Sequence, residues 1–281
     1  MRLKNLYFTV LLSFSVVIVF AQHQGTPKNL KIISYNIWNG FEWGKDSVRQ
    51  NNMIGWLKKK SPDVLALQEL NDFNQEKLEH EAKKWGHNYA LILKETGYPV
   101  GITSRYPIEL KERIREGMSH GVLHCKTAGV DFFVVHLSPF QHKKRHKEAK
   151  IILEKLSKIV SSQDKYIVLG DFNAESPFDA HLYKGNKELI KEKKNSEEKN
   201  AVIRNLLQGN LDYGVISSFL GFPLIDVTQQ YTDSLEDRIT FPTQVFEEKK
   251  GEGRSIHSIR IDYIMVSPLL ASKCFNAGVY N

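Results

Sequence analysis

Short apolar runs alternate with charged, periodically apolar stretches along most of this chain. Three stretches predict helices: Lys45–Lys60, which has apolar residues at intervals and ends before Pro62, and Phe73–Trp85 and His142–Ser161, which are rich in lysine and glutamate. Hairpin-like pairs at 120–135 complete a pattern of sheets covered by helices, an α/β or α+β layered domain. The apolar runs are short and rich in β-branched residues, which favours buried strands over helices: Leu30–Ser34, Val64–Leu67, Tyr89–Leu93, Phe132–Val135, Tyr166–Leu169 and Ile261–Val266.

A polar group stands at the end of, or inside, five of the apolar runs. Catalytic groups are often held on loops at strand ends by a rigid sheet. One such residue is usually a turn former. Five together, with carboxylates, amides and an imidazole, indicate a functional site. They are Asn36, Gln68-Glu69, His136, Gly170-Asp171-Phe172-Asn173 and Asp262.

These residue types suit metal-assisted hydrolysis of a phosphate ester. Mg²⁺ prefers oxygen ligands, retains waters and contacts substrate phosphate, which Asn36 and Glu69 would allow. Asp171 would align or deprotonate the attacking water. Asn173 would donate to a phosphate oxygen, and His136 would donate to phosphate or protonate the leaving group.

Taken in order along the chain, these motifs resemble those of the endonuclease/exonuclease/phosphatase superfamily, the DNase I-like phosphoesterases. The resemblance extends from about Leu30 to Val266, and its Gly-Asp-Phe-Asn and Gln-Glu elements are specific in combination. It rests on Ser34-Tyr35-Asn36-Ile37-Trp38-Asn39-Gly40, Leu67-Gln68-Glu69, Val135-His136-Leu137-Ser138, Gly170-Asp171-Phe172-Asn173 and Arg260-Ile261-Asp262-Tyr263-Ile264.

The resemblance implies a four-layer sandwich in which two β-sheets pack face to face with helices outside. It also implies a phosphoesterase that depends on Mg²⁺ or Mn²⁺. Matched by position, the site contains a metal-proximal pair, a histidine found in the nuclease and sphingomyelinase branches, a water-orienting aspartate, a phosphate-binding asparagine and an aspartate that orients the last catalytic histidine. These are Asn36 with Glu69, His136, Asp171, Asn173 and Asp262.

The sequence departs from the family pattern after Asp262. The family usually continues into Ser-Asp-His and an apolar strand, whereas the last histidine here is His257. We therefore expect a domain over residues 28–281 that is C-terminally incomplete, because the missing strand would leave a neighbour in the sheet unpaired. The alternative is a catalytically impaired module that retains the fold and binds a phosphate ligand without hydrolysing it.

Composition adds information about the chain's class, its N-terminal segment and its net charge. With 41% hydrophobic and 25% charged residues, disordered, collagen-like and disulfide-scaffold chains are excluded. Met1–Ala21 has the features of a signal peptide, which predicts a secreted or periplasmic protein without stable membrane insertion after cleavage. Removing Arg2 and Lys4 with it lowers the formal net charge from +7 to +5, which favours anionic partners such as nucleic acid or phospholipid.

Two motifs that contain histidine have competing interpretations. Gly117-Met118-Ser119-His120-Gly121 matches the Gly-x-Ser-x-Gly pattern of serine hydrolases, but the strand-like residues that follow Ser119 do not fit the helix which that motif requires. His120 is either a substrate-binding residue at the phosphate site or a structural histidine. His142 and His146 have the spacing of helical zinc ligands, but the lysines and arginine between them favour the basic start of a helix.

Trp38 and the two cysteines leave further alternatives open. Trp38 either contacts substrate, by stacking on a base or entering a lipid interface, or packs in a small cluster under its loop. Cys125 and Cys274 either form a disulfide, which export would permit, or remain buried thiols.

The function that fits best is an exported phosphodiesterase acting on nucleic acid, a phospholipid headgroup or a small phosphorylated metabolite. Its oligomeric state stays open.

Overall fold

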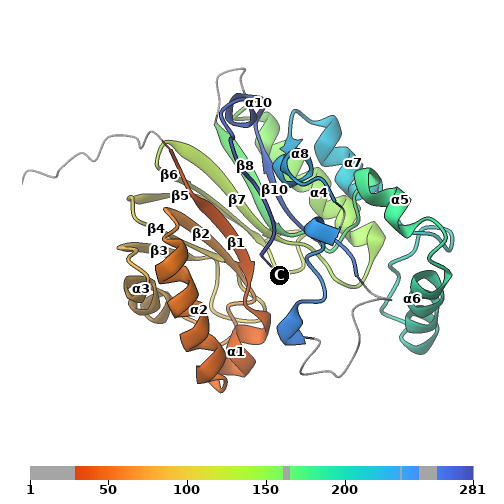
Figure 1. The fold of residues 1–281 in the computed structure, drawn as a ribbon, viewed down its shortest axis with the longest axis horizontal. Helices are drawn as coiled ribbons and strands as arrows, with labels where there is room; N and C mark the ends of the chain where they lie inside the picture. The colour runs from red at the N-terminus through yellow and green to blue at the C-terminus, as the bar shows by residue number, and fades with distance from the viewer. Residues whose placement is uncertain (1–28, 161–164, 235, 247–257, 281) are drawn as a thin grey trace, which may run out of the picture.

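The computed structural model describes residues 29–160, 165–234, 236–246 and 258–280. The expected signal peptide, the end of the predicted helix at Ser161, His257 and Asn281 lie outside these residues. Within them the chain forms two β-sheets with helices on their outer faces (Figure 1). Of the helices described, none is both long enough and apolar enough to span a bilayer.

The smaller sheet contains four strands in the order β1-β2-β4-β3. β1 and β2 run parallel, and β4 pairs antiparallel with both β2 and β3. The strands predicted at 30–34, 64–67 and 89–93 are confirmed, with ends that differ by at most two residues. Their bounds are β1 (Ile32–Asn36), β2 (Val64–Gln68), β3 (Tyr89–Ile92) and β4 (Gly101–Ser104).

The larger sheet contains six strands in the order β5-β6-β7-β8-β10-β9. β7 and β8 run parallel, and the other neighbours run antiparallel. The hairpin predicted at 120–135 is confirmed as the β6–β7 pair. The bounds are β5 (Ile108–Ile114), β6 (Val122–Thr127), β7 (Val130–His136), β8 (Tyr166–Asp171), β9 (Ile225–Asp226) and β10 (Asp262–Val266).

Helices cover both outer faces. α2 and α3 lie against the smaller sheet, and α4 and α7 lie against the larger one (Figure 1). α2, α3 and α4 confirm the three predicted helices, although α4 ends at Ser157, before the predicted end at Ser161. The helical elements are α1 (Trp38–Gly44), α2 (Ser47–Lys60), α3 (Gln75–Lys84), α4 (His142–Ser157), the 3-10 helix η1 (Pro177–Asp179), α5 (Ala180–Tyr183), α6 (Lys187–Lys199), α7 (Gly214–Gly221), α8 (Val227–Tyr231), the 3-10 helix η2 (Glu236–Arg238) and α10 (Pro268–Ala271).

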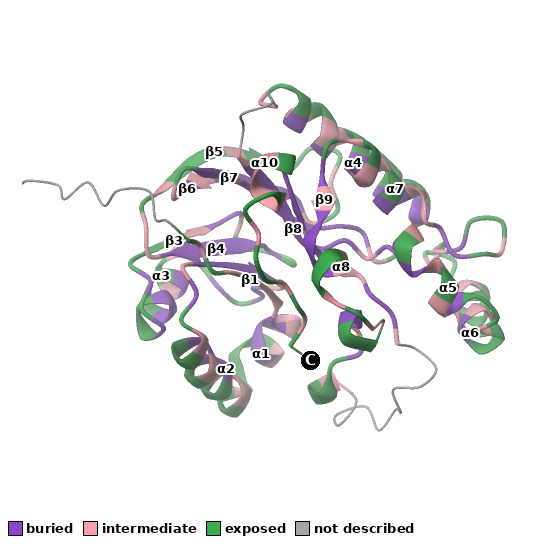
Figure 2. Ribbon diagram, turned by 45° about the horizontal axis from the view of Figure 1, so that its top comes forward, coloured by how far each residue is buried: buried purple, intermediate pink, exposed green. Residues whose placement is uncertain are grey.

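Alternating side chains on the central strands divide the core into three apolar layers. On β2, Leu65 packs under α2 and α3, whereas its neighbour Val64 packs between the two sheets. On β7, Phe132 lies between the sheets and Phe133 packs under α4 and α7. Figure 2 shows the result, with buried central strands and exposed outer helix faces. Full burial of such a side chain stabilises the fold by about 1.5–3 kcal/mol. The predicted four-layer sandwich is therefore confirmed.

The fold also decides two alternatives from the sequence. Cys125 and Cys274 are both free thiols, so no disulfide links them. Ser119 precedes strand β6 instead of a helix, and its backbone N–H donates to Glu148 Oε1 (2.6 Å). The strand-to-helix turn that a serine nucleophile requires is absent at Ser119.

Candidate active site

The ends of five strands bring the predicted polar residues to one edge of the two sheets. Asp171 pairs in register with His136 on β7 and with Asp262 on β10, so these three residues form a row across the larger sheet. Asn36 ends β1, and Glu69 directly follows the neighbouring strand β2. Loops and strand ends on a rigid sheet are a common position for catalytic side chains.

A cavity of about 360 Å³ lies at this edge. His120 lines the cavity together with the catalytic candidates. Trp38 also lines the cavity and packs on Phe246, with ring centroids 5.2 Å apart. Convergence of titratable and polar groups in one pocket marks a candidate active site. All eight residues expected from the sequence line it: Asn36, Trp38, Glu69, His120, His136, Asp171, Asn173 and Asp262.

Asn36 connects the two sheets through its side-chain amide. Its Nδ2 donates to Asp171 Oδ2 on the larger sheet (3.2 Å) and to Glu69 Oε1 (3.1 Å). Its Oδ1 accepts a hydrogen bond from the backbone N–H of Trp38 (2.9 Å). Asn36 thus fixes the two carboxylates relative to each other.

The turn after β1 has a left-handed backbone, with φ between 52° and 59° over most of α1. Such a conformation costs an ordinary residue about 1–2 kcal/mol. The turn is held by Glu69 Oε2, which accepts from the Asn39 N–H (2.7 Å), and by Arg49, which donates to two backbone carbonyls at its start. Gly40 is required here, because a Cβ would lie 1.9 Å from the Asn71 carbonyl oxygen. Glu69 therefore both faces the cavity and secures the turn beside it.

The Gly-Asp-Phe-Asn motif forms a tight turn around the Asp171 carboxylate. Gly170 has a φ of 136°, and a Cβ there would lie 2.1 Å from the Val135 carbonyl oxygen. Asp171 Oδ1 accepts from the backbone N–H of Asn173 (2.8 Å). Asn173 Nδ2 in turn donates to the carbonyl oxygen of Leu137 (3.0 Å). The motif's glycine and asparagine thus position its aspartate.

Three carboxylates share the cavity. Burial and the charges of Asp262 and Glu69 raise the pKa of Asp171 well above its usual range. Burial raises the pKa of Asp262 to about 7, with a smaller contribution from Glu69 and an opposing one from a hydrogen bond with Thr240. A divalent cation would offset this repulsion, and carboxylate and amide oxygens are ligands that Mg²⁺ and Mn²⁺ prefer. The donor set therefore fits the cation that the family resemblance implies.

His120 and His136 stack on one another with ring centroids 4.3 Å apart. Burial lowers the pKa of His136 to well below its usual value, and the charge of His120 adds to this. Burial and the charge of Lys94 lower the pKa of His120 to about 4. His136 Nε2 lies 3.7 Å from Asp171 Oδ2, and its buried Nδ1 has no hydrogen-bond partner within the described residues. His136 thus presents a neutral imidazole, which suits hydrogen-bond donation better than storage of a proton for the leaving group.

Sequence reasoning missed several residues of the cavity. Tyr98 packs against both histidines, with ring centroids 5.4 Å from His120 and 6.5 Å from His136. Thr240 Oγ1 accepts from the backbone N–H of Asp262 (3.2 Å), at the start of β10. Both residues come from loops without a recognisable motif, so only the tertiary structure identifies them.

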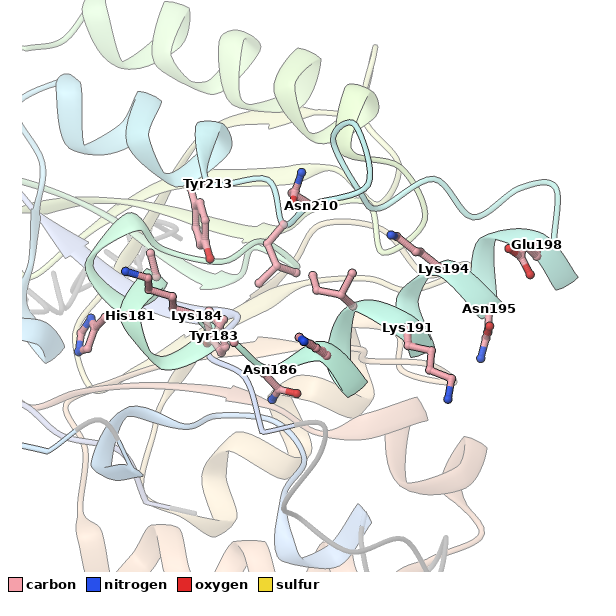
Figure 3. Close-up of a pocket in the computed structure, with 15 residues that line it drawn as sticks. His181, Tyr183, Lys184, Asn186, Lys191, Lys194, Asn195, Glu198, Asn210 and Tyr213 are labelled. Atoms are coloured by element: carbon pink, nitrogen blue, oxygen red, sulfur yellow. The ribbon is translucent and has the colours of Figure 1, made fainter.

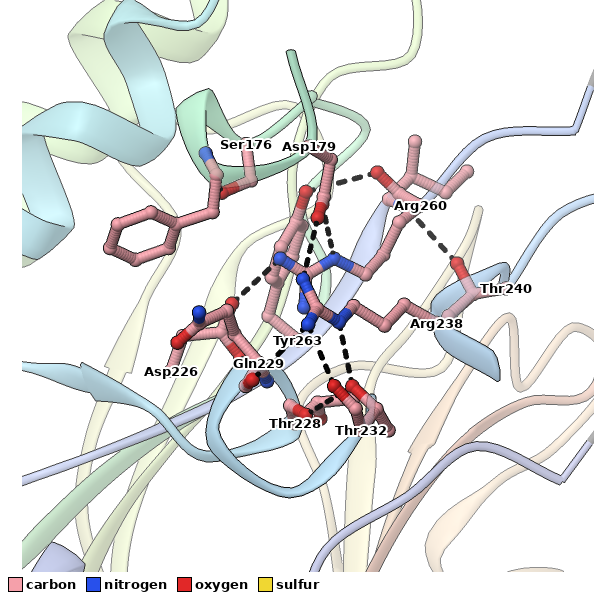
Figure 4. A network of polar contacts seen from close by, with 12 residues as sticks. Ser176, Asp179, Asp226, Thr228, Gln229, Thr232, Arg238, Thr240, Arg260 and Tyr263 are labelled. Atoms are coloured by element: carbon pink, nitrogen blue, oxygen red, sulfur yellow. Dashed lines mark hydrogen bonds and ion pairs between the residues drawn. The ribbon is translucent and has the colours of Figure 1, made fainter. Parts of the chain in front are cut away.

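A buried ion-pair network fixes the start of β10 (Figure 4). Arg260, whose side chain is fully buried, pairs with Asp179 (2.6 Å) and with Asp226 (2.7 Å). Arg238 also pairs with Asp179 (3.4 Å). Because Asp262 follows Arg260 by two residues, the network determines where this carboxylate enters the cavity.

A larger cavity of about 850 Å³ lies beside α5 and α6 (Figure 3). Three of its lysines, among them Lys191 and Lys194, lie on α6, and its lining includes one carboxylate, Glu198. No residue of the predicted motifs lines it. Although three asparagines also line it, it lacks the group of three carboxylates found in the smaller cavity.

Several solved structures share this fold. An AP endonuclease from Archaeoglobus fulgidus superposes with a TM-score of 0.64 at 21% identity, over 88% of this chain and 90% of that one. The 3′-5′ exonuclease NExo from Neisseria meningitidis superposes with a TM-score of 0.58 at 17% identity, over 86% of this chain and 89% of that one. D. rerio TDP2 complexed with a single-stranded DNA product superposes with a TM-score of 0.56 at 18% identity, over 85% of this chain and 83% of that one. Similarity at these identities establishes the fold.

The sequence itself matches a family model over residues 33–278. This span contains every candidate site residue from Asn36 to Asp262. No curated protein matches the chain. On the strength of the family match, the chain belongs to the endonuclease/exonuclease/phosphatase family of hydrolases.

Proposed function

We propose that this protein is an exported phosphodiesterase that uses Mg²⁺ or Mn²⁺ to hydrolyse a phosphodiester by attack of water. The observation that carries the proposal is the bridge in which Asn36 donates to both Glu69 (3.1 Å) and Asp171 (3.2 Å) inside the cavity. Through this bridge Glu69, the proposed cation ligand, and Asp171, the proposed base for water, belong to one hydrogen-bonded group.

Glu69 and Asn36 would hold the cation. Each Glu69 carboxylate oxygen accepts one hydrogen bond in this structure, which leaves further lone pairs for a ligand bond. When bound, the ion supplies positive charge that stabilises the phosphoryl oxygens during reaction.

Asp171 would orient the attacking water and accept its proton. Its two oxygens are fixed by Asn173 N–H (2.8 Å) and Asn36 Nδ2 (3.2 Å), so the carboxylate is held rigidly at the cavity edge. A well-placed general base contributes about 10²–10⁴-fold to the rate.

Asn173 and His136 would bind the phosphoryl oxygens. One amide hydrogen of Asn173 goes to the Leu137 carbonyl (3.0 Å), and Nδ2 carries a second hydrogen that a phosphate oxygen would accept. The neutral His136 ring supplies a further N–H donor. Donors fixed before the reaction stabilise the charge that develops on phosphate without reorganisation.

The aromatic rim of the cavity favours a substrate with a flat group next to its phosphate. Trp38, Tyr98 and Phe140 line the cavity, and the last two are exposed to solvent. Stacking of a base on an aromatic side chain contributes about 1–3 kcal/mol. Nucleic acid is therefore the first substrate class to test, before phospholipid headgroups and small phosphorylated metabolites.

Hydrolysis of bis(p-nitrophenyl) phosphate by residues 22–281 tests the proposal. We expect turnover with Mg²⁺ or Mn²⁺, none in EDTA, and losses of at least ~100-fold in Asp171→Asn and His136→Ala. Asp72→Asn, at an exposed carboxylate outside the cavity, is the matched control and should keep the wild-type rate. Hydrolysis that persists in EDTA would overturn the proposal.

Two further measurements address the alternative module and export. Binding of inorganic phosphate without turnover of any ester in the panel would favour the catalytically impaired module. Expression of the whole chain in a bacterial host, followed by N-terminal sequencing of the exported fraction, should show cleavage after Ala21.

A further inference from the structure

The start of α4 contains a histidine pair that meets a buried carboxylate outside the active site. His142 begins α4, as predicted for a basic helix start, and His146 follows one turn later. Asp212, which belongs to no recognisable motif, approaches both: its Oδ2 lies 2.8 Å from His146 Nε2 and 3.8 Å from His142 Nδ1. The three ligand atoms lie within 4.8 Å of one another. None of these residues lines the active-site cavity.

The Nδ1 atom of His142 is buried and has no hydrogen-bond partner in the described part of the chain. The side chain of His142 is 10% exposed and that of Asp212 is 1% exposed. A buried polar atom left without a partner is destabilising, and an unseen ion is one of the explanations for such an atom. This nitrogen faces the Asp212 carboxylate from a distance too long for a hydrogen bond. A cation between the two atoms would satisfy both.

The ligand atoms suit a transition-metal ion. Two imidazole nitrogens and one carboxylate oxygen are a common donor set for Zn²⁺, whereas Mg²⁺ and Ca²⁺ prefer oxygen ligands alone. Tetrahedral bonds of about 2.0–2.1 Å separate ligand atoms by roughly 3.4 Å. The distances of 2.8 and 3.8 Å lie on either side of this value. A small movement of His146, whose side chain is 42% exposed, would complete the geometry.

The surroundings fix the carboxylate and leave space for an ion. Asp212 Oδ1 accepts from the backbone N–H of Gly214 (2.9 Å), the kind of outer contact that orients a metal ligand. A Cβ at position 214 would lie 2.8 Å from His146 Cε1, so glycine keeps this side of the cluster open. The exposed side of His146 provides an entry path and a fourth position for water.

We propose that His142, His146 and Asp212 bind one divalent transition-metal ion of the Zn²⁺ class. The ion would connect the start of α4 to the segment before α7, two elements far apart in sequence. Lys143 and Arg145 carry positive charge on the same turns of α4, so we expect an affinity below that of a zinc finger with thiolate ligands. This proposal is independent of the phosphodiesterase proposal.

Calorimetric titration with Zn²⁺ tests the site. The purified protein is first freed of metal with a chelator and then kept in excess Mg²⁺, which competes with Zn²⁺ at sites made of oxygen ligands. We expect one Zn²⁺ per chain and a higher Tm in its presence. Titration with Co²⁺ should give the visible absorption of a four-coordinate site.

His146→Ala is the decisive variant, because this side chain is partly exposed and its loss should not prevent folding. We expect it to weaken Zn²⁺ binding at least ~100-fold and to abolish the Co²⁺ absorption. His80→Ala, at an exposed histidine of α3, is the matched control and should bind as the wild type does. Equal Zn²⁺ binding by wild type and His146→Ala, or no binding by the wild type, would overturn the proposal. Because hydrolysis is not measured, either result leaves the phosphodiesterase proposal untouched.

Discussion

The Nδ2 atom of Asn36 lies 3.2 Å from Oδ2 of Asp171, although the two residues are 135 positions apart and belong to different sheets. The same nitrogen donates to Glu69 (3.1 Å). The contact forms because β1 and β8 end at the same edge of two sheets that pack face to face. Sheet packing and site geometry are therefore coupled, and a change in one should be detectable in the other.

Replacing Asn36 by alanine should uncouple the two carboxylates. We expect Asn36→Ala to hydrolyse bis(p-nitrophenyl) phosphate at least ~10-fold more slowly at saturating Mg²⁺, because it removes a proposed cation ligand that also orients Glu69, and groups that orient metal ligands contribute about 10–100-fold to activity or affinity. The Mg²⁺ concentration for half-maximal rate should also rise. Initial rates over a Mg²⁺ series measure both quantities.

Ser34→Ala provides the control for Asn36→Ala. Ser34 lies on the same strand and its Oγ contacts Gln68, but it does not line the cavity. Its rate and Mg²⁺ dependence should stay within about twofold of the wild type, as for most substitutions away from a site. Wild-type Mg²⁺ dependence in Asn36→Ala would contradict the bridging role of this residue.

Ser119→Ala should leave hydrolysis intact. The alanine keeps the backbone N–H that donates to Glu148 (2.6 Å), and strand β6 follows this turn where a serine hydrolase needs a helix. A fluorophosphonate probe should therefore not label the wild-type protein, as judged by intact mass. Labelling that disappears in Ser119→Ala would restore the serine hydrolase alternative.

The parts of the fold that the sequence predicted are those with an unambiguous local pattern. β2 is apolar and fully buried, so its predicted and observed bounds differ only at Gln68. β1 extends two residues further than predicted, because Tyr35 and Asn36 remain in register with Leu67 and Gln68. Backbone pairing continued the strand into polar residues, which hydrophobicity alone does not show.

The missed parts depend on contacts between distant segments. β5 is rich in charged residues and largely exposed, so it has no apolar run to reveal it. The left-handed turn α1 requires Arg49 and Glu69 to hold it. Asp212 reaches His146 only after the chain has folded. In the same way, the motifs identified the acids and amides of the active site, but not Thr240 or Tyr98, which lie in loops without a motif.

Removal of the Arg260 charge should destabilise the protein severely. In Arg260→Met, Asp226 would lose its 2.7 Å partner and Asp179 would keep only the longer contact with Arg238. Leaving buried charges uncompensated costs about 3–5 kcal/mol. Urea unfolding should show this decrease in the free energy of unfolding.

The exposed pair Lys150–Glu154 gives a matched comparison for Arg260→Met. Both of its side chains are largely exposed on α4 and lie 3.8 Å apart. Lys150→Met should change the free energy of unfolding by less than about 1 kcal/mol, because exposed ion pairs contribute little. Similar effects of the two substitutions would mean that the network around Arg260 does not hold β10.

The stacked pair of His120 and His136 should make the stability of the fold depend on pH. Burial and the charge of Lys94 lower the pKa of His120 to about 4 in the folded protein, against about 6.5 in an unfolded chain. The neutral ring is therefore favoured by folding. The contribution of neutral His120 to the free energy of unfolding is fully present above pH 6.5. It decreases as the pH falls towards 4, since the unfolded chain takes up a proton that the folded chain does not.

His120→Gln should reduce this pH dependence while preserving a polar side chain in the cavity. Between pH 6.5 and 4.5, the free energy of unfolding of the wild type should fall more steeply than that of the variant, by up to ~1.4 kcal/mol per pH unit, the effect of one proton. Urea unfolding at pH 7.5, 6.5, 5.5 and 4.5 measures the two slopes. Acidic groups and His136 are present in both proteins, so they contribute to both slopes. Parallel slopes would show that His120 gains its proton as easily in the folded chain as in the unfolded one, and that the stacked pair is not held neutral.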